Sequence, residues 1–285
     1  MDHEQTMQAG SDVVALRRRP DARRVYAALV FIPLFYLLVR HLPPLAFFAL
    51  VAGAALLAQY EFYRLHFRET WSPWILGVGL AAGLGLLVSL QWPALVSERV
   101  VLLGILAAAL ASPLASRVSL ERSLLDASVL VFGVLYVALT LGHLVLARAL
   151  EQGEFLIFFL FLVTWAGDTG AYYAGVAFGR HRLAPVVSPN KTIEGLIGGL
   201  GLAVVIALVA QIWFLPSWTL AECAGLGIGL TLIGVVGDLS ESALKRSAGV
   251  KDSGVIIPGH GGVLDRLDSL LFTAPAFYYY VTLVK

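Results

Sequence analysis

The chain has 285 residues, of which 59% are hydrophobic and 14% are charged, and its formal net charge is +1. The mean hydropathy of +0.82 excludes an ordinary soluble protein and indicates an integral membrane protein. The near-neutral charge, with no basic patch interleaved with aromatic residues outside the N-terminal arm, argues against a nucleic-acid partner. The one cysteine, Cys223, excludes a disulfide framework, and we expect it to be a small core residue.

The N-terminal segment, residues 1–24, is polar and ends in a group of five arginines. A secretory signal would also begin basic, but no small-residue cleavage site follows the first apolar run. We therefore expect residues 1–24 to form a basic cytoplasmic arm. Residues 25–285 are then a polytopic membrane domain, with the densest polar motif at residues 237–268.

Nine apolar runs follow the arm, which predicts an all-α integral membrane protein with about nine transmembrane helices. Several runs are shorter than the roughly 20 residues that cross a bilayer core. We expect residues 45–60 and 100–113 to be tilted, partial or merged spans. The runs are Val25 to Val39, Leu45 to Tyr60, Trp71 to Leu90, Val100 to Pro113, Ala127 to Ala147, Phe155 to Phe178, Gly195 to Leu215, Cys223 to Val236 and Ser269 to Val284.

The loop charges indicate the orientation of these spans. With a cytoplasmic N-terminus, 16 of the 20 Lys and Arg residues fall on the cytoplasmic side and 4 on the other side. This asymmetry follows the positive-inside rule and places the C-terminus outside. It also places every candidate catalytic loop on the cytoplasmic side of the membrane.

The run from Phe155 to Phe178 contains a single charged residue, Asp168. An ionised Asp at the centre of a lipid-facing helix costs about 2.5–3.5 kcal/mol on insertion scales. We therefore expect Asp168 to face a polar cavity or a partner. A buried acid paired with an Arg for assembly is the structural alternative.

A second polar segment runs from Ser188 to Gly195. Ser188 followed by Pro189 is typical of an N-cap and the first helical position, so we expect the next helix to begin there. Free N–H groups beside Lys191 and Thr192 would then form a phosphate site at the membrane surface.

The densest polarity lies between Gly237 and Asp268. If residues 237–248 are helical, four polar side chains at i, i+3, i+4 and i+7 share one face. A glycine-interrupted segment follows, in which Gly261 and Gly262 would let backbone N–H groups approach a ligand. Asp265 and Asp268 then lie on the first turn of the next helix. The four residues of the shared face are Asp238, Glu241, Ser242 and Lys245.

Acids from two elements, interleaved with Lys and Arg, suit Mg²⁺ shared with substrate phosphates. Such a site would hold a nucleoside triphosphate. For any single residue, a solvated cytoplasmic loop with ordinary ion pairs is the simpler interpretation. The whole group favours a site, because a solvated loop has no need of His260 and paired glycines between two acid clusters.

Two segments carry a family resemblance. The pattern Ser242-x-x-Lys245-Arg246-x4-Lys251-Asp252-x-Gly254-x-x-Ile257-Pro258-x-His260-Gly261-Gly262-x-x-Asp265-Arg266-x-Asp268 covers 27 positions. It resembles the C-terminal motif of the phosphatidate cytidylyltransferases, or CDP-diacylglycerol synthases. Residues 188–195 resemble the Ser-Pro-x-Lys-Thr-x-Glu-Gly element of the same family, although Asn190 stands where many relatives carry Lys.

The resemblance implies a multi-pass enzyme of the inner membrane that acts in phospholipid biosynthesis, with its active site facing the cytoplasm. It would join CTP and phosphatidic acid into CDP-diacylglycerol and pyrophosphate. The implied cofactor is Mg²⁺, with a second cation as a further option, and the implied assembly is a homodimer.

We assign roles to the polar residues under this hypothesis of nucleotidyl transfer. Asp238 and Asp265 are the expected metal ligands, and Asp268 and Glu241 lie beside them. Asp168 is a third acid that lines the cavity. Positive side chains would neutralise the triphosphate and the lipid phosphate, and a loop would shape the nucleotide site. These further residues are Lys245, Arg246, Lys251, Arg266, His260, Gly261 and Gly262, with Ser242 and Asp252 in the same motif and Ser188, Lys191 and Thr192 on the opposing helix end.

Two other functions fit parts of the pattern. A CTP-dependent kinase of a polyprenol lipid needs the same membrane cavity and Mg²⁺, but it transfers the γ-phosphoryl group. A transporter could use Asp168 as its coupling site, although no inverted repeat is visible and the polar residues concentrate near one end of the chain.

Overall fold

The computed structural model describes residues 33–41, 43–67, 73–115, 120–254 and 261–285. The basic arm, the start of the first apolar run and His260 lie outside the described residues. The elements are a helix over residues 33–41, α3 (Pro44–His66), α4 (Pro73–Gln91), α5 (Glu98–Ala115), η1 (Leu120–Arg122), α6 (Ser123–Gly133), the π-helical η2 (Val134–Leu139), α7 (Thr140–Arg148), α8 (Gly153–Phe178), β1 (Arg182–Ala184), β2 (Ser188–Thr192), α9 (Ile193–Phe214), α10 (Leu220–Ser247) and α11 (Leu264–Leu283).

Six helices within the described residues are long and apolar enough to cross a membrane. This confirms a helical, multi-pass membrane protein, while the count of nine spans and the orientation of the N-terminus stay predictions. The six are Pro44–His66, Pro73–Gln91, Ser123–Arg148, Gly153–Phe178, Ile193–Phe214 and Leu220–Ser247.

Two of these helices are longer than the apolar runs predicted. The run at residues 45–60, expected to be a short span, belongs to the 23-residue α3, which continues through Glu61 to His66. The run from Cys223 to Val236 and the polar segment after it form one 28-residue helix, α10. Both helices continue past the apolar run because their polar residues face protein partners there.

The outer surface of the bundle is apolar. Leu103, Ile197 and Ile212 are all more than 60% exposed, and α9 is apolar except for Glu194 in its first turn and Gln211 near its end. Such a surface is costly in water but suits the hydrocarbon core of a bilayer. The exposed face of α9 therefore faces lipid.

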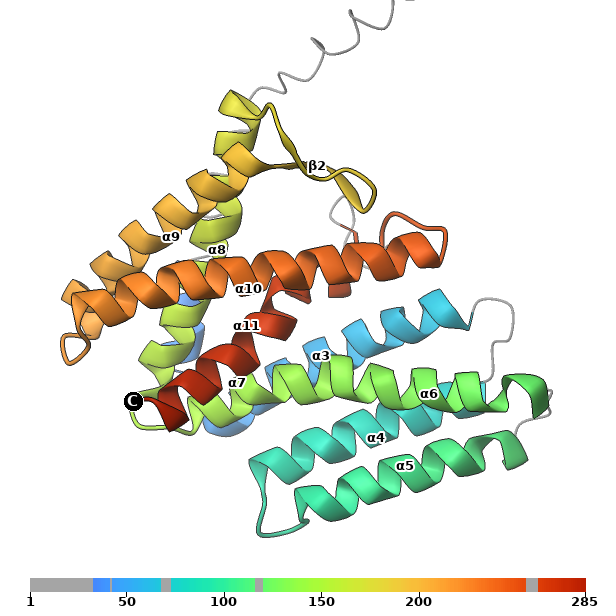
Figure 1. Ribbon diagram of the computed structural model, residues 1–285. Coiled ribbons are helices and arrows are strands. Elements are labelled where there is room, and N and C mark those ends of the chain that lie inside the picture. Colours follow the sequence, from blue (N-terminus) through green and yellow to red (C-terminus); the bar gives the residue numbers. More distant parts are fainter. Residues whose placement is uncertain (1–32, 42, 68–72, 116–119, 255–260) are drawn as a thin grey trace, which may run out of the picture.

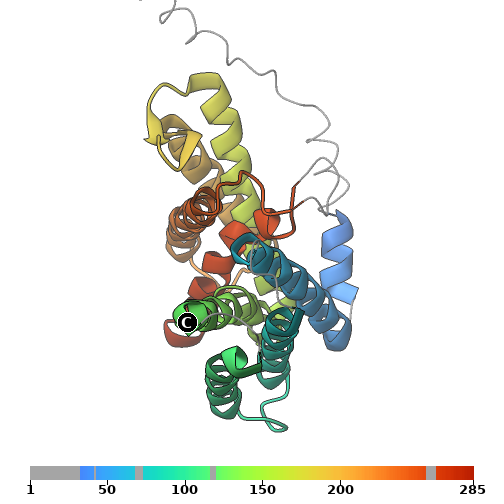
Figure 2. The same ribbon diagram turned by 90° about the vertical axis from the view of Figure 1, so that its right-hand side faces the viewer.

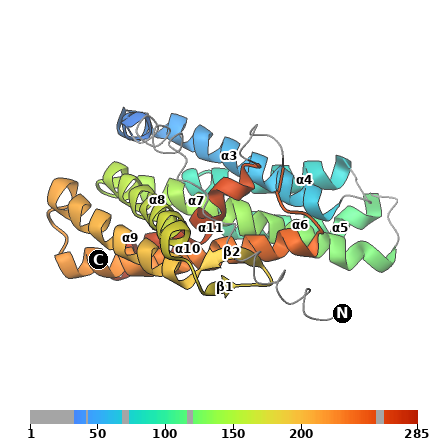
Figure 3. The ribbon, with the colours of Figure 1, turned by 90° about the horizontal axis from the view of Figure 1, so that it is seen from above.

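The helices surround α11, which packs between α10 and α7 (Figure 1). α8 and α9 form a tightly packed pair, and α4 and α5 lie at the opposite end of the molecule from the β-hairpin in two views (Figures 1 and 2). Seen from above, α8 and α9 occupy one side of the bundle and α4 to α6 the other (Figure 3). The core of the protein lies between these groups.

One end of the bundle gathers charges that are far apart in the sequence. The Arg40 guanidinium lies 2.9 Å from the Glu154 carboxylate, and Arg148 lies 3.4 Å from the same side chain. With a cytoplasmic N-terminus, the loop charges predict that Arg40 and Arg148 are two of the four positive residues on the non-cytoplasmic side. Their shared partner agrees with that grouping.

The segment before α9 differs from the prediction. Residues 188–192 form strand β2, which pairs antiparallel with β1 in the register Arg182 to Thr192. The N-cap is Thr192, whose Oγ1 accepts a hydrogen bond from the Gly195 N–H at 3.1 Å. The predicted helix start at Ser188 and Pro189 is therefore wrong, because pairing with β1 keeps this backbone extended until Thr192. Within the residues that the structure describes, this hairpin is the one sheet and the other regular elements are helices.

Glycines bring α8 and α9 into backbone contact. A Cβ at Gly199 would lie 2.7 Å from the Gly167 carbonyl oxygen, and a Cβ at Gly170 would lie 2.6 Å from the Gly198 carbonyl oxygen. Close packing of two helices therefore explains why these positions carry no side chain. By contrast, a Cβ at Gly201 would meet nothing within 4 Å.

Replacing Gly199 with Ala should therefore separate α8 from α9. We expect a cost of about 1–3 kcal/mol, because backbone atoms cannot move away as a flexible side chain could. The thermal midpoint in detergent should fall by about 3 °C or more. Gly201→Ala is the matched control, and an equal fall in both variants would contradict the packing argument.

Candidate functional site

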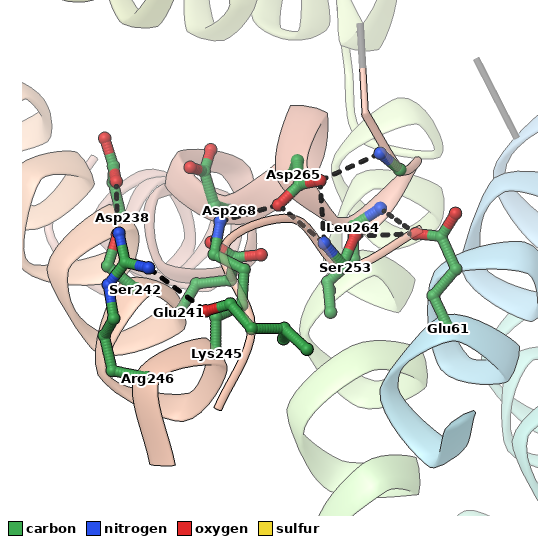
Figure 4. Close-up of polar contacts among 12 residues, drawn as sticks. Glu61, Asp238, Glu241, Ser242, Lys245, Arg246, Ser253, Leu264, Asp265 and Asp268 are labelled. Atoms are coloured by element: carbon green, nitrogen blue, oxygen red, sulfur yellow. Dashed lines mark hydrogen bonds and ion pairs between the residues drawn. The ribbon is translucent and has the colours of Figure 1, made fainter. Parts of the chain in front are cut away.

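The polar face of α10 forms as predicted. Ser242 Oγ donates to Asp238 Oδ1 at 3.4 Å, and Lys245 Nζ lies 2.5 Å from Glu241 Oε2. In each pair the acid lies one helical turn before its partner. Glu241 is fully buried, so its carboxylate depends on this ammonium for compensation. Figure 4 shows these side chains along one side of the helix.

Asp265, in the first turn of α11, connects α10 to the loop before α11. Its Oδ1 lies 2.6 Å from Lys245 Nζ, and its Oδ2 accepts N–H bonds from Ser253 at 3.0 Å and Gly262 at 2.8 Å. Burial alone would raise the pKa of this carboxyl, but the Lys245 ammonium and these N–H groups outweigh it and hold the pKa below its usual range. Asp265 is therefore an ionised side chain whose oxygens already have partners (Figure 4).

Gly261 permits the turn that aims these N–H groups at Asp265. Its φ is +82°, in the left-handed region, and a Cβ there would lie 2.8 Å from Asp265 Oδ2. A side chain at this position would meet both backbone strain and a collision with the carboxylate. The predicted close approach of backbone at Gly261 is therefore present, although the backbone here approaches an acid of the protein itself.

Asp168, Asp238 and Asp268 form a second group of acids. Charge interactions link Asp168 of α8 to Asp238, and Asp268 of α11 to both. Asp268 precedes the apolar segment that begins at Ser269. Its pKa is raised to about 7, mainly by burial and to a smaller extent by the carboxylates of Asp238 and Asp168. Acids that repel one another in this way favour a cation between them.

Lys191 brings the second predicted motif to this cluster. The hairpin and the start of α9 place its Nζ 2.5 Å from Asp238 Oδ2. The segment with residues 188–195 and the segment with residues 237–268 therefore meet through one ion pair. Sequence spacing alone could not show that contact, because 46 positions separate the two residues.

The other predicted residues lie at the edge of this region. Thr192 uses its hydroxyl oxygen to cap α9, and Ser188 begins β2. Arg246 Nη1 donates to the Val250 carbonyl at 3.2 Å, just past the end of α10. The exposed side chains in and after the loop are Lys251, Asp252 and Arg266, while His260 lies outside the described residues.

Sequence reasoning missed three polar residues near the site. Glu61 of α3 is buried and contacts the loop before α11, and Ser253 links Glu61 to Asp265. Tyr136, in the π-helical turn, is buried with no hydrogen-bond partner for its hydroxyl among the described residues, near Glu241 and Asp268. The signal in the sequence that could have indicated Glu61 is its position directly after the apolar run at residues 45–60, where it can continue the same helix.

Comparison with known proteins agrees with the two motifs. A model of the cytidylyltransferase family matches residues 22–284. The chain belongs to the cytidylyltransferase family. The match covers the membrane helices and both polar segments, so the site described above lies inside the family's shared region.

Several relatives of this chain are phosphatidate cytidylyltransferases of staphylococci. The protein of Staphylococcus saprophyticus is 44% identical over 153 residues, which is 54% of this chain and 58% of that protein. The protein of Staphylococcus aureus is 45% identical over 157 residues, and that of Staphylococcus epidermidis is 44% identical over 156 residues. The aligned region spans 58% of the length of each relative.

The acid cluster supplies only part of the ligands that a Mg²⁺ ion needs. Within the described ranges, no three His, Cys, Asp or Glu side chains are grouped closely enough to hold a metal by themselves. Mg²⁺ does not require such a group, because it is usually bound by one or two carboxylates together with waters and substrate phosphates. The mutually repelling acids at Asp238 and Asp268 fit that donor set.

Proposed function

We propose that this cytidylyltransferase transfers the cytidylyl group of CTP to phosphatidic acid, with CDP-diacylglycerol and pyrophosphate as products. The observation that carries the proposal is the contact of Lys191 with Asp238, beside Asp168 and Asp268. It joins the two family-like motifs into one site with both positive and negative groups. The staphylococcal relatives, which are named for this reaction, support the same assignment.

The proposed chemistry needs no nucleophile from the protein. A phosphate oxygen of phosphatidic acid attacks the α-phosphorus of CTP, and the bond from that phosphorus to the bridging oxygen of pyrophosphate breaks. The protein would align the two phosphates and neutralise their charge. Lys191 of β2 and Lys245 of α10 come from separate elements and each contacts an acid of the region, so they suit that role.

We propose Asp238 and Asp268 as the acids that hold Mg²⁺, with Asp168 beside them. Bound Mg²⁺ would neutralise charge on the substrate phosphates. This revises the expectation that Asp238 and Asp265 share the ion, because Asp265 already accepts from Lys245 and two backbone N–H groups. We assign Asp265 to positioning Lys245 and the loop.

The helix directions support a site at one end of the membrane bundle. α8 ends, and α9 begins, beside the hairpin, and α10 ends close to where α11 begins (Figure 1). We propose that this end faces the cytoplasm of a bacterial inner membrane, where soluble CTP would meet the phosphate of an anchored lipid. The implied homodimer stays a prediction.

The test uses purified protein, phosphatidic acid and CTP labelled in the α-phosphate, with and without Mg²⁺. We expect Mg²⁺-dependent label in the lipid product and release of pyrophosphate. Label left in CDP, with γ-phosphate transferred to a polyprenol, would show a kinase instead. Substrate uptake by sealed vesicles without nucleotide turnover would show a transporter.

A further inference from the structure

Glu61 of α3 is a buried acid whose carboxylate accepts three hydrogen bonds from the segment before and at the start of α11. Its side chain is 1% exposed. Oε1 accepts the Val263 N–H at 3.0 Å, and Oε2 accepts the Leu264 N–H at 2.8 Å and the Ser253 hydroxyl at 3.0 Å. Figure 4 shows Glu61 reaching from α3 toward the start of α11.

Two of these donors, at Val263 and Leu264, are the first backbone N–H groups of α11. The first N–H groups of a helix have no partner within the helix, and the N-terminus carries partial positive charge. Val263, the N-cap residue, has no side-chain oxygen that could accept them. Glu61 supplies the missing acceptor from α3, 202 positions away in the chain.

The glycines of the loop provide room for this carboxylate. A Cβ at Gly254 would lie 2.6 Å from Glu61 Oε1, and a Cβ at Gly262 would also collide with the Glu61 carboxylate. Both glycines belong to the motif that resembles the family pattern. Their absence of a side chain is therefore explained by Glu61 as well as by any ligand.

We propose that Glu61 is a positioning residue that fixes the start of α11. Asp265 and Asp268 follow Leu264 by one and four residues, so the direction in which α11 begins determines where both carboxylates lie. Glu61 acts through this backbone and does not touch the substrates. The inference rests on the proposed function for its kinetic consequences, but not for its effect on the loop.

The test is Glu61→Gln. Both carboxylate oxygens accept hydrogen bonds, so either orientation of the amide places an NH₂ group against another donor. We expect kcat to fall about 10- to 100-fold, since a displacement of about 1 Å at a site has effects of that size. The KM for phosphatidic acid should change less than about twofold, because Glu61 makes no substrate contact.

Hydrogen exchange measured by mass spectrometry gives a readout that does not depend on activity. In Glu61→Gln, amides in residues 261–268 should exchange at least about tenfold faster, while α3 and α7 keep the wild-type rates. Glu222→Gln is the matched control. Its carboxylate accepts the Thr219 N–H at 2.7 Å at the start of α10, away from the site.

Ser253→Ala is a milder variant that removes one of the three donors. We expect an intermediate fall in kcat, and the double variant should be no worse than Glu61→Gln alone, because both changes act on one network. Additive losses, or kcat and exchange equal to those of Glu222→Gln, would overturn the proposal.

Faster exchange spread over α3 and α7, with a lower thermal midpoint, would also overturn it and make Glu61 a general stabiliser. If the wild-type protein forms no CDP-diacylglycerol, the proposed function fails. The exchange comparison still decides the role of Glu61 in that case.

Discussion

Replacing Asp238 with Asn is expected to lower CDP-diacylglycerol formation at least about 100-fold and to raise the Mg²⁺ concentration needed for half-maximal rate. The Asp238 carboxylate repels the carboxylates of Asp168 and Asp268 and forms an ion pair with Lys191. An amide in its place keeps the size of the side chain but loses the anion. The measurement is the initial rate over a Mg²⁺ titration with both substrates saturating.

The control for this substitution is Asp126→Asn. Asp126 is another acid on a helix, but it is buried in the first turn of α6, with Arg122 as its charged neighbour. We expect its Mg²⁺ dependence to match that of the wild type. A Mg²⁺ titration of Asp238→Asn that overlays the wild-type curve would remove Asp238 from the proposed cation site.

Replacing Asp265 with Asn should also abolish most activity, for a different reason. The amide loses the ion pair with Lys245 and turns an NH₂ group toward backbone donors, either at Ser253 or at Gly262. We expect lipid-dependent release of pyrophosphate to fall at least about 100-fold. The protein should remain in the membrane at normal abundance, because the change is confined to one end of the bundle.

The Mg²⁺ titration separates the two acids. If Asp265 positions Lys245 and the loop, the residual activity of Asp265→Asn should reach half its maximum at the wild-type Mg²⁺ concentration. A large increase in that concentration would restore Asp265 as a metal ligand, as the sequence pattern first indicated. Full activity in the variant would exclude Asp265 from the site altogether.

Much of this protein could be predicted from local sequence. Apolar runs identified the membrane helices, because a segment that crosses lipid must satisfy its backbone internally and present apolar side chains. The i, i+3 and i+4 spacing placed Asp238, Glu241, Ser242 and Lys245 on one helical face, since that spacing depends only on the helix period. The glycines after Lys251 marked the break before α11 for a similarly local reason.

Partners between elements could not be predicted in this way. The sequence pattern paired Asp238 with Asp265 because both belong to one motif, whereas the fold gives Asp265 to Lys245 and places Asp238 with Lys191. The extended backbone at Ser188 depends on pairing with β1, which no local preference encodes.

The sequence by itself determined most of the helical segments, including six that are long and apolar enough to cross a membrane, and which polar residues share a helix face. These properties follow from hydropathy and from the helical period within one segment. Only the tertiary structure decided that Glu61 of α3 holds the start of α11 and that Asp168, Asp238 and Asp268 form one cluster. Those contacts depend on how whole helices pack, and the sequence of one helix does not specify which neighbouring helix its polar atoms will contact.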